Sequence, residues 1–316
     1  MITVLAGGVG AARLLAGLIQ VVDPAELTAV VNTGDDLVLH GLEISPDLDT
    51  VTYTLANAIN SETGWGLADE TWRAMETLKR YGGVSWFNLG DRDLGTHLFR
   101  TQRLADGAPL SEITAEIVRG WGLALRVLPV TDDRLRTMVT VVDDDTPDEG
   151  LEVGFQEYFV HRQHSVPVRG VRFAGSDTAT AGPEVLESII DAEVIVIAPS
   201  NPIVSIGPIF AVKGVHEAVT ARRDRVVAVS PIIAGAALKG PADRLMKELG
   251  HESSVVGVAR LYRGVASTLV IDELDADLAP AVEAEGMRCV VTQTIMSNPT
   301  TSAALGRAVL EAGRAR

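Results

Sequence analysis

The sequence contains little of what builds a disulfide-rich or membrane-spanning protein. Its 316 residues include one cysteine, Cys289, which excludes an internal disulfide framework and a cysteine-based zinc cluster. We expect this cysteine to be a small buried apolar side chain beside the two valines that follow it. No apolar run approaches the ~20 residues that a membrane-spanning helix needs. No basic segment precedes the first apolar run, so we expect a cytoplasmic protein with no membrane partner.

Positive charge is also scarce. The chain has 27 Lys and Arg residues against 42 Asp and Glu residues, which gives a net charge of −15. Such a surface repels the phosphate backbone of DNA or RNA, and no basic stripe offsets it locally, so we expect no nucleic-acid partner. A site for an anionic small molecule would need backbone N–H groups, a few placed arginines or a metal ion.

Hydrophobic residues, by contrast, make up 47% of the chain and suffice for a large core. Short apolar runs bounded by turn residues alternate with helical patterns. The runs cover residues 2–6, 27–31, 194–198, 226–229, 268–271 and 289–291. Strands that are apolar on both faces are typical of a parallel sheet covered by helices. The sequence therefore predicts an α/β fold with a Rossmann-like, doubly wound and mostly parallel sheet.

Two segments interrupt this alternation. Residues 50–125 carry helical patterns, notably at 69–80 and 110–121, and we interpret them as a helical insertion or cap. Residues 136–175 alternate apolar and polar positions at 138–142 and 153–160, on either side of a turn at 143–150, which predicts an antiparallel excursion. The chain has no internal repeat and no linker, so we expect one domain spanning residues 1–316.

A glycine cluster, Gly7-Gly8-Val9-Gly10, lies between the first predicted strand and a predicted helix at 11–22. In that position glycines let the backbone approach an anion, and the helix N-terminus directs N–H groups toward it. Arg13 stands where a dinucleotide fingerprint requires a third glycine, which argues against an ordinary NAD site. No Gly-Lys-Ser/Thr follows, so a Walker-type loop is excluded. A tight turn without a ligand is the alternative.

Four carboxylates follow shortly after. Asp35 and Asp36 follow the second predicted strand after Asn32-Thr33-Gly34, and Asp47 and Asp49 lie on either side of Leu48. Carboxylates gathered beside a phosphate site would repel the substrate unless a divalent cation bridges them, so the pattern predicts Mg²⁺. Helix caps or solvated loops are the alternative.

A third polar segment contains Asp91-Arg92-Asp93 and His97. An arginine between two aspartates forms either a local ion-pair knot or an anchor that its neighbours orient toward a ligand. The histidine could act as an acid or base, or simply donate a structural hydrogen bond.

Two proline-containing loops follow buried runs in the second half of the chain, and their polar groups could bind a base or a sugar. The candidate residues are Ser200, Asn201, Pro202, Ser205, Gly207 and Ser230. Because both loops follow predicted strands, together they favour a nucleotide crevice more than either does alone.

Seven segments together resemble the 2-phospho-lactate transferase family, known as CofD in archaea and FbiA in actinobacteria, which acts in biosynthesis of the deazaflavin coenzyme F420. They are GGVGAARLLAGL, VVNTGDD, ISPDLDT, LGDRDLGTHL, FQEYFV, APSNPIVSIGPI and SPIIAGAALKGPAD. They run from residue 1 to about residue 245, and the resemblance is weaker after residue 250.

The resemblance implies a Mg²⁺-dependent transfer carried out by a homodimer. A phospholactyl or phosphoenolpyruvyl group would move from a guanosine diphosphate ester to the ribityl hydroxyl of the deazaflavin FO, with release of GMP. The motifs do not separate the lactyl donor from the enolpyruvyl donor.

The resemblance also implies roles for individual residues. Asp35 and Asp47 would bind the metal, whereas Asp49, Asp36 and Arg92 would be catalytic, with Asp49 at the deazaflavin hydroxyl. The residues that would contact substrates are Gly7, Gly8, Val9, Gly10, Arg13, Asp91, His97, Ser200, Asn201, Pro202, Ser205, Gly207 and Ser230.

Two other classes of protein stay open. The YvcK-like regulators share the glycine loop and bind a uridine sugar nucleotide without known turnover. They carry a Pro-Gly-Asp-x-Arg segment where this chain has Pro46-Asp47-Leu48-Asp49-Thr50. An NAD(P)-dependent dehydrogenase is disfavoured by Arg13.

Overall fold

A seven-stranded parallel sheet forms the centre of the computed structural model, which describes residues 1–142 and 150–315. The strands follow the order β14 (Arg288–Val291), β13 (Thr268–Ile271), β10 (Val226–Val229), β9 (Val194–Ile197), β1 (Ile2–Ala6), β2 (Leu27–Val31) and β5 (Arg126–Pro129). Every neighbouring pair is parallel. The order reverses between β9 and β1, so the predicted doubly wound fold is confirmed.

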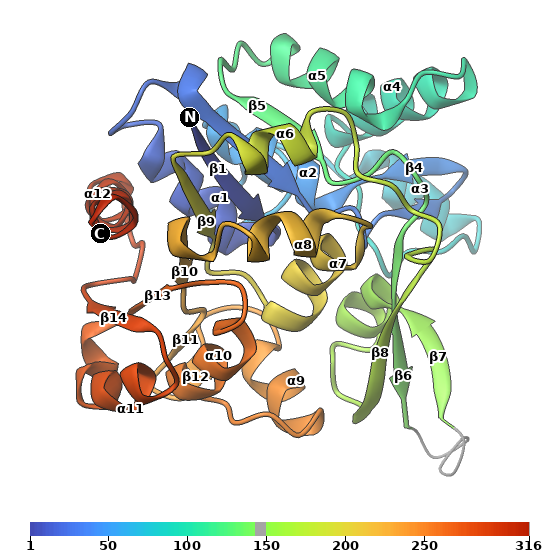
Figure 1. Cartoon of the computed structure of the whole chain (residues 1–316). Helices are drawn as coiled ribbons and strands as arrows, with labels where there is room; N and C mark the ends of the chain where they lie inside the picture. Colours follow the sequence, from blue (N-terminus) through green and yellow to red (C-terminus); the bar gives the residue numbers. More distant parts are fainter. Residues whose placement is uncertain (143–149, 316) are drawn as a thin grey trace.

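Helices cover both faces of this sheet (Figure 1). One face packs against α1 (Gly8–Leu18), α2 (Pro46–Leu55) and α12 (Pro299–Arg314), and the other against α6 (Val185–Ile190), α8 (Val215–Thr220) and α10 (Val255–Tyr262). Burying a Val, Leu or Ile side chain stabilises the fold by about 1.5–3 kcal/mol. With apolar residues on both faces, the central strands form a rigid support for the loops at their carboxyl ends.

Two expectations about this layer need correction. The first helix spans Gly8–Leu18 instead of residues 11–22, so it begins three residues earlier and ends four residues earlier than predicted. Gly8 has a φ of +71°, which favours glycine, and this turn lets the chain pass from β1 into the helix through Gly7 alone. Cys289 is only partly buried, because it lies on the edge strand β14. Burial, with a smaller effect from the nearby Glu283 carboxylate, raises the pKa of its thiol to about 11.

Residues between β2 and β5 form a hairpin and several helices. The hairpin pairs β3 (Leu37–Leu39) with β4 (Leu42–Ile44). After α2 come α3 (Arg73–Arg80), α4 (Asp93–Ala105) and α5 (Leu110–Gly120), and α4 lies beside α5. The helix predicted from residue 69 starts at Arg73 because the Asp91 carboxylate accepts hydrogen bonds from the first backbone N–H groups of α3.

A separate three-stranded antiparallel sheet follows β5, in the order β7 (Leu151–Gly154), β6 (Arg136–Val141) and β8 (Val168–Ala174). The predicted strand at 153–160 is wrong beyond Gly154, since Glu157–His161 is a helical turn. Phe155 and Tyr158, three residues apart, both enter the small core of this sheet, which only helical spacing permits. Residues 143–149 of the predicted turn lie outside the described residues.

The C-terminal part completes the sheet and adds short elements. They are α7 (Gly207–Ala211), β11 (Ile232–Ile233), β12 (Ala236–Ala237), α9 (Ala242–Glu248) and α11 (Ala279–Ala284). Within residues 1–142 and 150–315, no helix combines the length and the apolar character needed to cross a membrane.

Candidate active site at the carboxyl edge of the sheet

The reversal between β1 and β9 brings the glycine cluster against the loop after β9. The Ser200 Oγ donates to the Gly7 carbonyl over 2.7 Å and accepts from the Gly7 N–H over 3.3 Å. A Cβ on Gly10 would lie 2.2 Å from the Pro199 carbonyl oxygen, so glycine is required there for the loop to pack on α1. The cluster thus joins the two halves of the crevice in which ligands of such folds bind.

The Asp47 carboxylate lies at the N-terminus of α1. The Asn32 Nδ2 donates to its Oδ2 over 2.9 Å. Burial is the largest effect on this group and raises the pKa of Asp47 to about 6, although hydrogen bonds from Asn32 and the Gly8 backbone lower it. The helix N-terminus therefore already faces an anionic side chain.

Asp35 and Asp36 lie close to Asp47, and we call these three residues the carboxylate cluster. Burial raises the pKa of Asp35 well above its usual value, and repulsion from Asp47 and Asp36 raises it further. Burial also raises the pKa of Asp36, although a 2.7 Å hydrogen bond from the Ser45 hydroxyl to its Oδ2 and the charge of Arg100 lower it.

The carboxylate cluster has unused ligand atoms. The Oδ1 atoms of Asp35 and Asp36 are buried and have no hydrogen-bond partner among the described residues. Buried carboxylate oxygens without a donor are costly, and oxygen atoms of this kind are the ligands that Mg²⁺ prefers. Individual oxygens of Asp35 and Asp36 are therefore candidate cation ligands, whereas in residues 1–142 and 150–315 the one set of three ligand atoms within 4.8 Å of one another comes from Asp49, Asp93 and His97.

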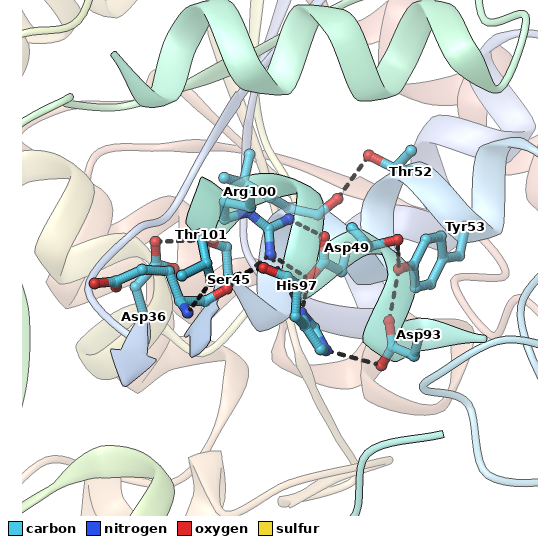
Figure 2. Close-up of polar contacts among 12 residues, drawn as sticks. Asp36, Ser45, Asp49, Thr52, Tyr53, Asp93, His97, Arg100 and Thr101 are labelled. Atoms are coloured by element: carbon cyan, nitrogen blue, oxygen red, sulfur yellow. Dashed lines mark hydrogen bonds and ion pairs between the residues drawn. The ribbon is translucent and has the colours of Figure 1, made fainter. Parts of the chain in front are cut away.

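A second buried group, which we call the paired network, lies between α2 and α4 (Figure 2). It consists of Asp49 and Tyr53 on α2 and of Asp93, His97 and Arg100 on α4. Both oxygens of Asp49 accept hydrogen bonds from the Arg100 guanidinium, which is 2% exposed. The His97 Nδ1 lies 3.7 Å from the Asp49 carboxylate and its Nε2 lies 3.2 Å from that of Asp93. The Tyr53 hydroxyl donates to Asp93 over 2.6 Å.

Electrostatics distinguish this network from the carboxylate cluster. Burial raises the pKa of Asp93, but the hydrogen bond and charge of His97, together with the Tyr53 hydrogen bond and the Arg100 charge, outweigh it, so the pKa is lowered overall. Asp49, Asp93 and His97 could offer ligand atoms within 4.8 Å of one another. However, the Arg100 Nη1 lies 3.4 Å from the His97 Nδ1 and already neutralises Asp49. We therefore assign these residues to ion pairing.

Two pockets open beside the carboxylate cluster, and both are lined by Asp36, Leu37 and Arg134. Further residues of the first pocket include Thr33, Glu43, Ser45, Arg100, Leu104 and Leu110. Further residues of the second include Gly34, Asp35, Trp86, Arg136, Thr137 and Phe155. Asp36 therefore borders both pockets, and neither pocket is lined by the glycine cluster or by the loop after β9.

Sequence reasoning missed the arginines of this region. Arg100 lies three residues after His97, and Arg134 follows β5 much as Asp35 follows β2. The position of Arg134 could have been predicted, because polar residues at the carboxyl ends of neighbouring parallel strands meet at one edge of the sheet.

Asp91 and Arg92 lie in the loop before α4. Asp91 accepts hydrogen bonds from the Thr71 hydroxyl and from the start of α3, and Arg92 donates to the Ala68 carbonyl. In the part of the chain that the structure describes, no ion pair joins Arg92 to Asp91 or Asp93, so the ion-pair knot does not form.

The other predicted contact residues are distributed around the crevice. Arg13 donates to the Met296 carbonyl over 3.5 Å, and the Ser230 hydroxyl bonds to the backbone of Ile232. The Asn201 Oδ1 accepts from two backbone N–H groups of the turn that Pro202 begins. Its buried Nδ2 has no partner among the described residues.

Two further contacts show how the loop after β9 is placed. A Cβ on Gly7 would lie 2.7 Å from the Ser205 Cβ, and one on Gly207 would lie 2.8 Å from the Phe173 ring. Ser205 thus lies at the glycine cluster, whereas Gly207 packs against the small antiparallel sheet. Val9 forms part of the first turn of α1.

Fold and site together define an α/β protein with a doubly wound sheet and a carboxylate-lined site at the edge where its strand order reverses. A model of the family described as 2-phospho-L-lactate transferase CofD matches residues 2–301. The chain belongs to this family, as its motifs indicate, and the match extends beyond the segment in which the motifs lie.

Individual relatives agree with this membership. The chain is 45% identical over 312 residues to a phosphoenolpyruvate transferase of Streptomyces griseus, covering 98% of this chain and 97% of the relative. It is 42% identical over 320 residues to one of Mycolicibacterium smegmatis, covering 98% of each. A crystal structure of a UPF0052 family protein from Bacillus halodurans has the same fold, with a TM-score of 0.62 at 18% identity over 98% of each chain.

Proposed function

We propose that this protein is a Mg²⁺-dependent transferase of coenzyme F420 biosynthesis. It moves a phosphoenolpyruvyl or phospholactyl group from a guanosine diphosphate ester to the ribityl hydroxyl of FO and releases GMP. The observation that carries the proposal is the carboxylate cluster, of which Asp36 lines two pockets and Asp35 one, in a member of this transferase family. The names of the relatives favour the enolpyruvyl donor.

The reaction needs positioning and charge neutralisation more than covalent catalysis. The ribityl oxygen forms a bond to the phosphorus that bears the three-carbon acid, while the bond from that phosphorus to the GMP oxygen breaks. Asp35 and Asp47 would hold the cation, which when bound would neutralise charge that develops on the phosphates.

Asp36 is the better candidate for the group that takes the hydroxyl proton. It lines both pockets, and its buried Oδ1 has no partner among the described residues. Its raised pKa also suits a general base. Asp49 was predicted for this role, but both of its oxygens accept from Arg100, so we propose that it acts in positioning.

The nucleotide would bind at the N-terminus of α1, beside the loop after β9. The first-turn N–H groups of α1 provide donors for phosphate. The buried Nδ2 of Asn201, which has no partner among residues 1–142 and 150–315, offers a donor for the base or sugar. The contact of Arg92 with the deazaflavin, the substrate contacts of Asp91 and His97, and the homodimer stay predictions.

The test incubates the purified protein with FO, Mg²⁺ and each guanylated donor, with product detection by mass spectrometry. We expect a deazaflavin product and GMP from at least one donor, and neither when the metal is removed by chelation. Absence of product from both donors would overturn the proposal. A melting-temperature increase with a uridine sugar nucleotide, but not with GDP, would then favour a regulator.

A further inference from the structure

Arg134 lies at the junction of the two pockets, together with Asp36 and Leu37. Its side chain is exposed, and no hydrogen bond or ion pair to it is found among the described residues. By contrast, the nearby Arg100 has both terminal nitrogens on Asp49. An unpaired guanidinium therefore stands between the two pockets, beside Asp36.

The backbone that carries Arg134 is fixed to the site. The Val130 N–H donates to the Val31 carbonyl over 2.9 Å, and the Thr137 N–H donates to the Gly34 carbonyl over 2.6 Å. These bonds hold the segment between β5 and β6 against the loop that contains Asp35 and Asp36. The backbone is thus held by hydrogen bonds both before and after Arg134.

Two carboxylates immediately before Arg134 do not neutralise it. Asp132 accepts from the Ser111 N–H over 2.6 Å and from its hydroxyl over 2.8 Å. Asp133 accepts from the N–H and the hydroxyl of Thr180, each over 2.9 Å. Because both carboxylates bind other segments, they stiffen the loop and leave the positive charge of Arg134 available.

The chemistry of the proposed donor supplies an anion for this cation. Its phosphates would be bound by the metal and by the N-terminus of α1, which leaves the carboxylate of the three-carbon acid without a partner. A guanidinium matches a planar carboxylate with two parallel hydrogen bonds. We propose that Arg134 binds the carboxylate of the transferred three-carbon acid and holds it at the junction of the pockets. This inference rests on the proposed function.

The test compares Arg134→Met and Arg134→Lys with the wild type. We expect Arg134→Met to lower kcat/KM for the guanylated donor by about 10- to 100-fold, because a charge-assisted hydrogen bond is lost. Arg134→Lys should recover part of this loss, since lysine keeps the charge but not the paired geometry. The melting temperature should not change, because the side chain is exposed and unpaired. Arg307→Met, on the exposed side of α12, is the matched charge-loss control.

Calorimetric binding identifies which anion Arg134 recognises. We expect Arg134→Met to weaken binding of the guanylated acid while GDP, which lacks the carboxylate, binds as in the wild type. Equal weakening for both ligands would assign Arg134 to phosphate and overturn the inference, as would wild-type kinetics in Arg134→Met. If the wild type binds the guanylated acid in an Arg134-dependent manner but forms no product, the proposed reaction fails and the inference about Arg134 stands.

Discussion

Asp47 and Asp49 lie in the same turn of α2, but their carboxylates have opposite surroundings. Asp49 is bound by the buried guanidinium of Arg100, within a network that contains its own cation. Asp47 accepts a neutral amide hydrogen bond from Asn32 and lies beside the buried Asp35 and the partly buried Asp36. Asp49 thus belongs to a buried ion pair, whereas Asp47, only two residues earlier, belongs to a group of like charges.

This difference indicates which side chains serve the fold and which are reserved for a ligand. A buried carboxylate that is paired with a guanidinium of the same chain is already neutralised. Buried carboxylates without a cation raise the free energy of the folded protein when no ligand is bound. We infer that the paired network fixes α4 on α2, and that the carboxylate cluster is completed by the metal of the reaction.

The largest effect on stability is expected from breaking the paired network. Arg100→Met leaves Asp49 buried without a cation, which should lower the free energy of unfolding by about 3–5 kcal/mol. Urea unfolding measures the loss. The control is Arg103→Met, three residues further along α4, which breaks partly exposed ion pairs with Glu112 and Glu116 and should cost less than about 1 kcal/mol. Equal losses in the two variants would contradict the distinction.

Changing the carboxylate cluster should affect activity and leave the fold intact. Asp36→Asn keeps the shape and the contact with Ser45 but removes the proposed base, so turnover should fall by about 100- to 1000-fold. Product formation under saturating substrates measures this. Near-normal turnover in the variant would remove Asp36 from the mechanism.

The pH dependence of stability should differ between the two groups. Because the folded-state pKa of Asp47 is raised to about 6, its contribution is present at pH 4 and is lost as the pH rises through about 6. A shift of this size corresponds to about 3 kcal/mol. Without metal, Asp47→Asn should therefore gain stability relative to the wild type between pH 4 and pH 7, as followed by urea unfolding.

Saturating Mg²⁺ should remove this difference, because a bound cation favours the charged carboxylate. Asp93→Asn serves as the comparison, since the pKa of Asp93 is lowered and the sign of its contribution is reversed. If the free energy of unfolding changes with pH in the same way in the wild type and in Asp47→Asn, then Asp47 does not titrate as described.

The sequence predicts the fold well because each strand of a buried parallel sheet can be recognised from its own short segment. Strands buried on both faces must be apolar throughout, so the runs at 2–6 and 27–31 identify β1 and β2 without knowledge of the rest. The segment at 153–160 misleads because Phe155 and Tyr158 fit both an alternating and a helical pattern, and packing with the small core decides between them.

The site is only partly predictable for a related reason. Strand ends and motifs bring Asp35, Asp36 and Asp47 to one edge of the sheet. Whether a neighbouring carboxylate is already neutralised depends on packing between distant segments, as with Arg100 and Asp49, which are 51 residues apart. The sequence therefore identifies the pool of carboxylates but does not separate the paired ones from the unpaired ones.

Calorimetric titration of the protein with Mg²⁺ tests the central claim most directly. The account predicts one site per chain that is lost in Asp35→Asn and Asp47→Asn and retained in Asp93→Asn, with each variant confirmed as folded. Binding that survives in Asp47→Asn but disappears in Asp93→Asn would place the metal in the paired network and contradict the account.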